Sequence, residues 1–539
     1  MMENRTIWLG LDGGTFSILD PLMEEGVMPF LKQFIASGTR GRLVSVIPPI
    51  TQPAWTSMMT GRSPGNHGIF DFFRFESPNS RYVRFLNSRN IACETIWSIL
   101  NRQGLKATSL NFPVMTPIRP INGFIVPGWV PERHIRRGCY PRDLYDRLNE
   151  IDGVSVKEMA MDPVADRMAL TGIPKNDYQG WIEEHTRKEE QWFKSLCYLM
   201  KEEPCHLTAI LFDGMDKLQH LCWRFISPEH FPKNPSSWEQ EIRNICLNYY
   251  RKLDDFIAEI VAIAGSEANI FMASDHGFST SVEIFYLNTW LQQNGYLKWA
   301  KDVEVASADN IDSQDPRIIL PRNYVNTLDW HQTTAHGLTA SSNAVHISVS
   351  GQRGEEGGVP LEDYERFRQE LINALLQFTP DETGKPVVTK VWKREEIFAG
   401  SQMYLAPDLT LGLRDEGFIS TLRSNIVYMK RPEPVGTHHR DGIFIAGGPG
   451  IDKGLSVDEF SILDVTSILL YSLGLPIPED LEGRVPTEIF EKDFIQTHPV
   501  CIGEATLPPE EFPQEQTDEM DAKGKAAILR RLKALGYVD

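Results

Sequence analysis

Three apolar segments, each followed at once by acidic or histidine residues, most constrain how this chain can fold. They are residues 6–11 (TIWLGL), 206–212 (HLTAILF) and 268–274 (ANIFMAS), and patterns of helical periodicity lie between them. Strands that alternate with helices predict a mostly parallel central sheet with helices on both faces. The chain is therefore expected to belong to the α/β class.

Other segments extend this alternation, and two regions interrupt it. The interruptions, at about residues 113–180 and 280–340, are expected to be cap insertions on one catalytic domain spanning residues 1–505. Residues 506–539 are expected to form an acidic linker and a short helix. We further expect strands at 41–47, 105–112, 344–350 and 442–446, and helices at 18–35, 181–200, 238–264, 361–377, 462–473 and 523–535.

Charge and cysteine content narrow the range of partners. The net charge of −19 at pH 7 argues against a nucleic-acid polymer, because binding to a phosphate backbone needs a basic surface. A small anionic substrate held by metal ions is compatible with it. We expect no membrane span and no signal peptide, since no stretch has the necessary apolar length. The seven scattered cysteines, without C-x-x-C, are typical of a reducing compartment, so we predict a cytoplasmic protein.

Thr51 stands at a predicted helix start, between an apolar run ending in two prolines and the segment QPAWTSMMTG. Pro53 suits a first helical turn, where a missing N–H costs little. Threonine is a common N-cap residue, so a purely structural role is one interpretation. The other is a solvent-facing nucleophile, because the free N–H groups at a helix N-terminus favour a phosphoryl or sulfuryl anion.

Aspartate and histidine residues gather where three predicted strands end. Asp12 follows the first of these strands, Asp216 and His220 follow the second, and Asp275 and His276 follow the third. Asp216 and His220 are four apart, so they share one face if residues 213–225 form a helix. Ligands of α/β sheets gather at the carboxyl ends of strands. Carboxylate oxygen with imidazole nitrogen suits Zn²⁺, and also Mn²⁺ or iron.

A further imidazole is offered by His438 or His439 in the segment GTHH at 436–439. Together these motifs resemble the alkaline phosphatase superfamily and, within it, the type I phosphodiesterase/nucleotide pyrophosphatase family. The matching motifs, in the family's order, are GLDG (10–13), T-x-P with a later TG (51–61), SPGNHGI (63–69), D-x-x-x-H (216–220), SDHG (274–277) and GTH (436–438).

The resemblance implies two divalent metal ions, zinc or manganese. It also favours His438 over His439, because His438 fits the family's G-x-H spacing. His67 falls in the H-G-I turn and is expected to be structural, and a loop or core position is expected for His331 and His336. The implied ligands are Asp216, His220 and His438 for one ion, and Asp12, Asp275 and His276, with Thr51, for the other.

The activity that the resemblance implies is hydrolysis of a phosphodiester or pyrophosphate bond in a small phosphorylated substrate. Two cations about 4 Å apart lower the pKa of a hydroxyl, clamp a phosphate oxygen and stabilise the leaving oxygen. In-line attack by Thr51 would give a phospho-threonine intermediate, which water would then hydrolyse.

One position departs from the family pattern. Nucleotide pyrophosphatases place an asparagine about five residues after the H-G-I histidine, where this chain has Phe72. The change leaves specificity for nucleotide diesters open, and another donor has to take the place of the asparagine. Asn111 is one candidate, and the other is the basic run Arg133, Arg136 and Arg137, which is equally typical of a solvated loop face.

The sequence leaves other functions open. A phosphomonoesterase or a phosphoglycerate-mutase-like phosphotransferase would use the same metal site, with Phe72 marking a different phosphate pocket. A non-catalytic metal-binding protein is the alternative of another class, although all seven metal-site positions hold competent ligands. A sulfatase is disfavoured, since it needs a modifiable Cys or Ser with Arg four residues on, where this chain has Thr51 and Trp55. The sequence indicates neither the substrate nor the oligomeric state.

Overall fold

The computed structural model describes residues 5–77, 80, 82–161, 172–300, 327–351 and 357–509. The chain divides into two compact units. The first comprises Met1–Ile69, Asn87–Thr280 and Glu433–Glu510, and the second Phe70–Leu86, Ser281–Pro432 and Glu511–Asp539. The helix predicted at 523–535, and parts of both predicted cap insertions, lie outside the described residues. The predicted domain boundaries stay predictions.

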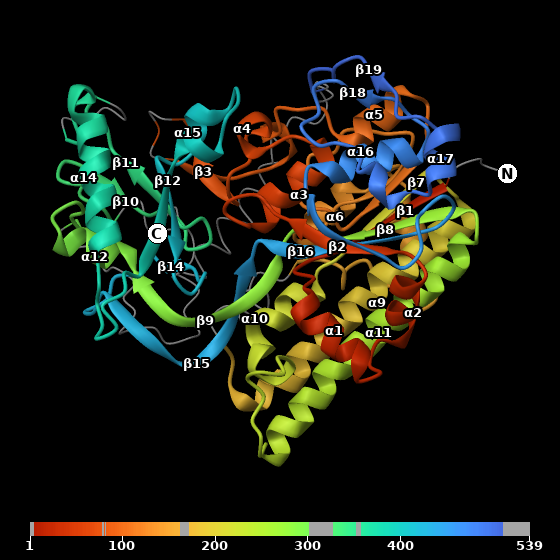
Figure 1. Ribbon diagram of the computed structural model, residues 1–539, viewed down its shortest axis with the longest axis horizontal. Coiled ribbons are helices and arrows are strands. Elements are labelled where there is room, and N and C mark those ends of the chain that lie inside the picture. Colours follow the sequence, from red (N-terminus) through yellow and green to blue (C-terminus); the bar gives the residue numbers. More distant parts are fainter. Residues whose placement is uncertain are drawn as a thin grey trace. The chain divides into compact units, whose positions relative to one another are not determined.

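An eight-stranded sheet forms the centre of the first unit (Figure 1). One strand pairs antiparallel with both of its neighbours, and all other neighbours pair in parallel. This confirms the predicted mostly parallel sheet. The strand order is β17 (Leu455–Ser461), β2 (Thr39–Val44), the antiparallel β16 (Asp441–Gly447), β8 (Ala268–Ala273), β1 (Arg5–Leu11), β7 (Leu207–Phe212), β5 (Ala107–Leu110) and β6 (Gly123–Val126).

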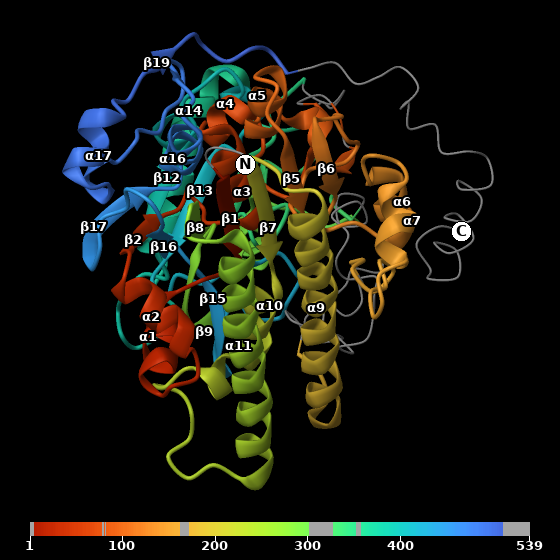
Figure 2. The ribbon, with the colours of Figure 1, turned by 90° about the vertical axis from the view of Figure 1, so that its right-hand side faces the viewer.

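Helices cover both faces of this sheet, because side chains along each strand alternate between two hydrophobic cores. In β1, Ile7, Leu9 and Leu11 pack into one core and Trp8 into the other. Figures 1 and 2 show the two groups of helices on opposite sides of the sheet. The first core takes residues of α1 (Phe16–Glu24), α2 (Pro29–Ala36), α9 (Tyr178–Glu202), α10 (Gly214–Ile226) and α11 (Ser237–Ala264), and the second takes residues of α3 (Thr51–Thr60), α5 (Ile96–Arg102) and α16 (Asp464–Ser472).

The single helix predicted at 18–35 is wrong. The segment forms α1 and α2, with a break between them. Gly26 has φ of +73°, the left-handed conformation in which helices commonly end. Pro29 then starts α2 at a position where a missing N–H costs little. The first unit also contains α4 (Pro64–His67), α6 (Glu132–Gly138), α7 (Leu144–Asn149), α17 (Lys492–Thr497), β18 (Ile477–Pro478) and β19 (Ile502–Gly503).

The second unit has its own hydrophobic core, which includes Trp290, Leu371 and Leu409. Its four-stranded sheet is antiparallel, in the order β10 (Ala335–His336), β11 (Ala344–Ile347), β13 (Leu409–Leu413) and β12 (Val388–Lys393). A three-stranded sheet has the order β14 (Ile419–Ser420), β9 (Gly277–Tyr286) and β15 (Tyr428–His439). Residues 277–280 of β9 and 433–439 of β15 belong to the first unit. The second unit also contains β3 (Phe73–Phe75), β4 (Val83–Phe85), α12 (Leu287–Gln293), α14 (Tyr364–Gln377) and α15 (Arg394–Ile397).

The helices and the cysteines bear on the expected absence of membrane spans and of disulfides. Across the described ranges, no helix has the length and apolar character needed to cross a membrane. All seven cysteines are free thiols, as the absence of a disulfide framework predicts. Six of them are buried, whereas Cys501 is exposed.

Candidate active site

Asp12 and Asp275 meet because their strands are neighbours. β1 and β8 pair in parallel, with Gly10 opposite Ala273, so the residues that follow them reach the same edge of the sheet. Both aspartates are fully buried. The Gly13 backbone N–H donates a hydrogen bond to Asp275 Oδ1 over 3.2 Å. His276 Nε2 lies 3.2 Å from Asp275 Oδ2 and 3.6 Å from Asp12 Oδ1.

Asp216 and His220 come from α10, which follows β7 on the other side of β1. Their i, i+4 spacing puts them on one helix face as predicted, with His220 Nε2 3.4 Å from Asp216 Oδ1. His438, at the end of β15, has its Nε2 atom 3.2 Å from Asp216 Oδ1 and 2.9 Å from His220 Nε2. The structure therefore brings these three residues together.

The three histidines of this cluster are oriented in the same way by the backbone. In each ring Nδ1 faces a carbonyl oxygen, to which it donates, so Nε2 keeps its lone pair for another partner. The rings of His276 and His438 stack with their centroids 3.5 Å apart. The Nδ1-to-oxygen distances are 3.3 Å for His220 and Gly436, 3.1 Å for His276 and Gly277, and 2.9 Å for His438 and Pro49.

Thr51 is the first residue of α3, and its hydroxyl lies at the same cluster. Oγ1 is 3.4 Å from His276 Nε2. The N-cap interpretation is wrong, because Ile50 holds that position and no side chain caps the helix. The expectation that Thr51 faces solvent is also wrong, since the residue is only 2% exposed. One turn further on, Trp55 Nε1 donates to Asp12 Oδ2 over 3.2 Å, which docks the helix against the end of β1.

Three carboxylate oxygens in the cluster have no hydrogen-bond partner among the described residues: Asp12 Oδ1, Asp216 Oδ1 and Asp275 Oδ2. Each of them faces a histidine Nε2. Acceptors and lone pairs cannot satisfy one another, and buried polar groups are nearly always satisfied. A cation is the partner that fits, and two overlapping groups of ligand atoms lie within 4.8 Å: Asp216, His276 and His438, and Asp12, Asp275 and His276.

The electrostatics of the cluster also call for positive charge. Burial raises the pKa of Asp12 and of Asp275, and nearby carboxylates raise both further. Burial lowers the pKa of His276 and of His438. Burial alone would raise the pKa of Asp216 too, but positive charge on the rings of His220 and His438 would hold it well below its usual range. A divalent cation would stabilise the carboxylates and the neutral imidazoles together.

A buried ion pair beside the cluster had no signal in the sequence. Lys217 Nζ lies 2.8 Å from Asp213 Oδ2, and both side chains are less than a tenth exposed. Asn111 Nδ2 donates to the Leu211 carbonyl over 2.8 Å and approaches Asp213 Oδ1 at 3.4 Å. The Asn111 amide, a candidate phosphate donor from the sequence, is therefore already engaged in holding the ends of β5 and β7 together.

The basic run lies on α6, which follows the edge strand β6. Arg133, Arg136 and Arg137 are all exposed. Arg136 pairs with Asp146 at 3.5 Å. β6 is the third strand away from β1, about 14 Å at the usual strand spacing. This position favours the solvated-face interpretation of the run.

The remaining histidines have separate places. His67 is fully buried, its Nδ1 accepts from the Ile69 N–H over 3.1 Å, and burial lowers its pKa to about 3. These contacts agree with the expected structural role. His439 Nδ1 accepts from the Asp441 N–H over 3.0 Å, so His438 is the member of the pair that reaches the cluster. His331 and His336, like Phe72, belong to the second unit.

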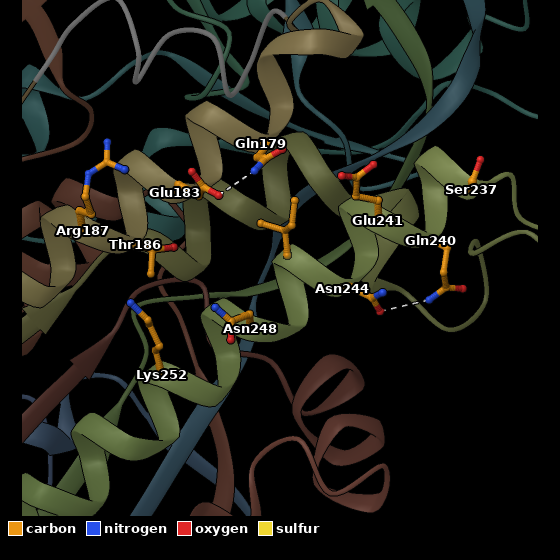
Figure 3. A pocket seen from close by; sticks show the side chains of 11 residues that line it. Gln179, Glu183, Thr186, Arg187, Ser237, Gln240, Glu241, Asn244, Asn248 and Lys252 are labelled. Atoms are coloured by element: carbon orange, nitrogen blue, oxygen red, sulfur yellow. Dashed lines mark hydrogen bonds between the residues drawn. The ribbon is translucent and has the colours of Figure 1, made fainter.

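A surface groove of about 780 Å³ lies between α9 and α11 (Figure 3). Its lining is mostly exposed and polar. Several of its side chains satisfy one another, such as Gln179 with Glu183 at 2.9 Å and Gln240 with Asn244 at 3.2 Å. None of the lining residues belongs to the Asp/His cluster. The groove therefore lacks the buried charged residues that are typical of a catalytic site.

Comparisons with known proteins identify the family. The model of the family described as type I phosphodiesterase/nucleotide pyrophosphatase matches residues 6–441. No curated protein sequence gives a significant match.

Solved structures show a similar fold. Murine ectonucleotide pyrophosphatase/phosphodiesterase 5 is 13% identical with a TM-score of 0.51, over 90% of this chain and 100% of that chain. The human counterpart is 14% identical with a TM-score of 0.51, over 91% and 100%. Phosphonoacetate hydrolase from Sinorhizobium meliloti 1021, solved with phosphonoacetate, is 14% identical with a TM-score of 0.50, over 87% and 96%. The chain belongs to the type I phosphodiesterase/nucleotide pyrophosphatase family and is a hydrolase of that type.

Proposed function

We propose that this chain is a two-metal hydrolase that cleaves phosphodiester or pyrophosphate bonds in small phosphorylated substrates, with Thr51 as nucleophile. The observation that carries the proposal is the convergence of three unpartnered carboxylate oxygens on histidine Nε2 atoms beside a buried hydroxyl. The donor set of oxygen and nitrogen suits zinc first and manganese second.

Thr51 and the six Asp and His residues of the cluster would hold two ions. His276 Nε2 is within reach of Asp12, Asp275 and Asp216, which supports two adjacent ions over two separate sites. Bound divalent ions would lower the pKa of the Thr51 hydroxyl and neutralise charge on the phosphoryl and leaving oxygens. Asp216, His220 and His438 would hold one ion, and Asp12, Asp275 and His276, with Thr51, the other.

Residues of α3 would supply the nucleophile and bind the phosphoryl group. Thr51 Oγ1 forms a bond to phosphorus while the bond to the leaving oxygen breaks, and the hydroxyl proton passes to solvent. The backbone N–H groups in the first turn of α3 face the anionic oxygens of the transferring group. Water then attacks the phosphorus on Thr51, which restores the hydroxyl and releases the phosphoryl product. Trp55 keeps Asp12 in place through its 3.2 Å hydrogen bond.

One solved relative bears on the choice of nucleophile. An inactive variant of the murine protein, in which a threonine is replaced by alanine, has been solved in complex with AMP. At 12% identity this concerns the murine protein, and for the present chain it supports testing Thr51 before any other residue.

The test compares wild type with Thr51→Ala on bis(4-nitrophenyl) phosphate in the presence of Zn²⁺ or Mn²⁺. Thr56→Val is the matched control, because Thr56 is a buried hydroxyl on the same helix whose hydrogen bond goes to a helix carbonyl. We expect turnover in wild type and in the control, and acid-quenched mass spectrometry should find phosphate on Thr51. Unchanged turnover in Thr51→Ala would rule the proposal out.

A second candidate, a phosphomonoesterase or phosphoglycerate-mutase-like phosphotransferase, is favoured by Phe72, which replaces the asparagine expected from the family. The ratio of rates on bis(4-nitrophenyl) phosphate and 4-nitrophenyl phosphate separates the two. A ratio above one supports the diesterase, and a ratio far below one supports the monoesterase. We also propose a cytoplasmic location, supported by the free cysteines, and cell fractionation tests it.

A further inference from the structure

The side chain of Gln52, the residue after Thr51, is buried, and the oxygen of its amide has no partner among the described residues. The residue is 1% exposed, and its Oε1 atom has no hydrogen-bond partner among the residues that the structure describes. The hydrogen bond that the Thr56 hydroxyl donates, at 2.7 Å, goes to the Gln52 backbone carbonyl instead. Buried side-chain amides in proteins are usually satisfied, so the free Oε1 atom points to a partner beyond the residues that the structure describes.

The position of Gln52 in the chain indicates that this partner would lie near the N-terminus of α3, where Thr51 is. Gln52 is the second residue of this ten-residue helix. Side chains on an α-helix lean towards its N-terminus, which puts the end of α3 where Thr51 Oγ1 meets His276 within reach of an amide in the first turn. Pro53 has no N–H. The first turn is therefore one donor short, and the amide at position 52 can supply one.

The other candidate hydrogen-bond donors to the phosphate are absent, already paired or distant from Thr51. The resemblance expects an asparagine where this chain has Phe72. The Asn111 amide donates to the Leu211 carbonyl, and the arginines of α6 are exposed beyond the edge strand of the sheet. Among these candidates Gln52 alone is adjacent to the nucleophile in the chain and buried, with an amide oxygen that has no partner among the described residues.

We infer that the Gln52 amide is a substrate-binding residue, whose Nε2 donates a hydrogen bond to a non-bridging oxygen of the phosphoryl group that Thr51 attacks. Half a turn about the last side-chain torsion brings either end of the amide to the same place, so the donating nitrogen can face the substrate. A neutral donor suits a phosphodiester with one negative charge, whereas the dianion of a monoester favours a cationic donor. This inference rests on the proposed function.

The test is Gln52→Met, which keeps the length of the side chain and removes the amide. We expect kcat/KM for bis(4-nitrophenyl) phosphate to fall about tenfold or more, because one hydrogen bond to the transition state is lost. We expect Tm to stay equal or to rise, because a buried amide with an unsatisfied oxygen is replaced by an apolar group. If Gln52 had only a structural role, Gln52→Met would lower Tm.

Gln191→Met is the matched control. Gln191 is a buried glutamine on α9, and its Oε1 accepts from the Ser155 N–H over 2.8 Å. This variant should lower Tm and leave kcat/KM unchanged. Calorimetry adds a readout without turnover: metal-loaded Thr51→Ala should bind inorganic phosphate about tenfold more tightly than the same protein with Gln52→Met added.

The outcomes separate this inference from the proposed function. If Thr51→Ala is inactive while Gln52→Met keeps wild-type kcat/KM or loses Tm and activity together, the role of Gln52 is wrong and the nucleophile stands. If Thr51→Ala keeps wild-type turnover, the proposed function fails, and the role of Gln52 fails with it.

Discussion

The Asp/His cluster at the ends of β1, β7 and β8 and the groove between α9 and α11 are both polar, but their polar groups are satisfied differently. In the cluster, Asp12, Asp216 and Asp275 are buried and each has a carboxylate oxygen without a hydrogen-bond partner among the described residues. In the groove, exposed side chains such as those of Gln240 and Asn244 bond to each other. Burying charge without a partner costs free energy that folding has to offset. Unpaired buried charge therefore indicates function better than the volume of a groove.

The largest effect is expected at Thr51. Thr51→Ala removes the only atom of that side chain that can attack phosphorus, so kcat on bis(4-nitrophenyl) phosphate should fall by at least about 10³-fold. Steady-state kinetics with metal-loaded protein measure this. A fall of less than tenfold would show that another residue is the nucleophile, and the proposed role of the Asp/His cluster in activating Thr51 would be wrong.

Loss of a single ligand should come next. His438→Ala removes an imidazole 3.2 Å from Asp216 Oδ1, and we expect a fall in kcat/KM of about 10²-fold or more, since ligands and their orientation set metal affinity and activity. His439→Ala is the matched control, because its Nδ1 accepts from the Asp441 N–H. Equal losses in the two variants would contradict the assignment of His438.

A buried and an exposed glutamate of α9 should differ in how they change stability with pH. Burial, and then the charge of Asp213, raise the pKa of Glu189 to about 7. The folded chain thus keeps this proton where the unfolded chain, with a pKa near 4.5, has lost it. The stabilisation from Glu189 is complete below about pH 4.5 and is lost as pH rises through about 7, a change on the order of 3 kcal/mol.

Calorimetric Tm values from pH 5 to 8 test this. Relative to Glu189→Gln, which cannot titrate, wild type should lose stability as pH rises. Glu183→Gln changes an exposed glutamate of the groove on the same helix, and it should follow wild type at every pH. A constant difference between wild type and Glu189→Gln would show that Glu189 keeps an ordinary pKa.

The smallest effect is expected in the groove. Asn248 is an exposed lining residue, and surface substitutions usually change stability by no more than about 0.5 kcal/mol. Asn248→Ala should leave kcat/KM within about twofold of wild type. A large loss of activity in this variant would mean that the groove takes part in the reaction.

The sequence predicts the parts of this molecule that depend on local patterns. Buried strands leave continuous apolar runs, and the residues that end parallel strands must share an edge, so Asp12, Asp216 and Asp275 were found together. The i, i+4 spacing on α10 likewise predicts that Asp216 and His220 share a face. The break near Gly26 was missed, although a glycine followed by a proline is a local signal for the end of one helix and the start of the next.

Other features depend on contacts between distant residues, which periodicity does not show. Thr51 is buried because α3 packs its whole length into the second core. The Lys217–Asp213 pair and the unpartnered amide oxygen of Gln52 depend on which neighbours the fold supplies. Glutamine beside a proline gives no sequence signal of this kind. The division into two units also follows from separate cores, which the pattern of strands and helices does not delimit.

If residues far apart in the chain hold two divalent ions beside one hydroxyl, the purified protein should bind two metal ions per chain, and metal analysis measures this number. The purified chain is stripped with a chelator, equilibrated with Zn²⁺, freed of unbound metal by gel filtration and analysed for zinc per chain. We expect two ions in wild type and in Asn248→Ala, and one in Asp275→Ala. A wild-type chain that retains no zinc, or an Asp12→Ala/Asp216→Ala/Asp275→Ala variant that still retains two ions, would contradict this expectation.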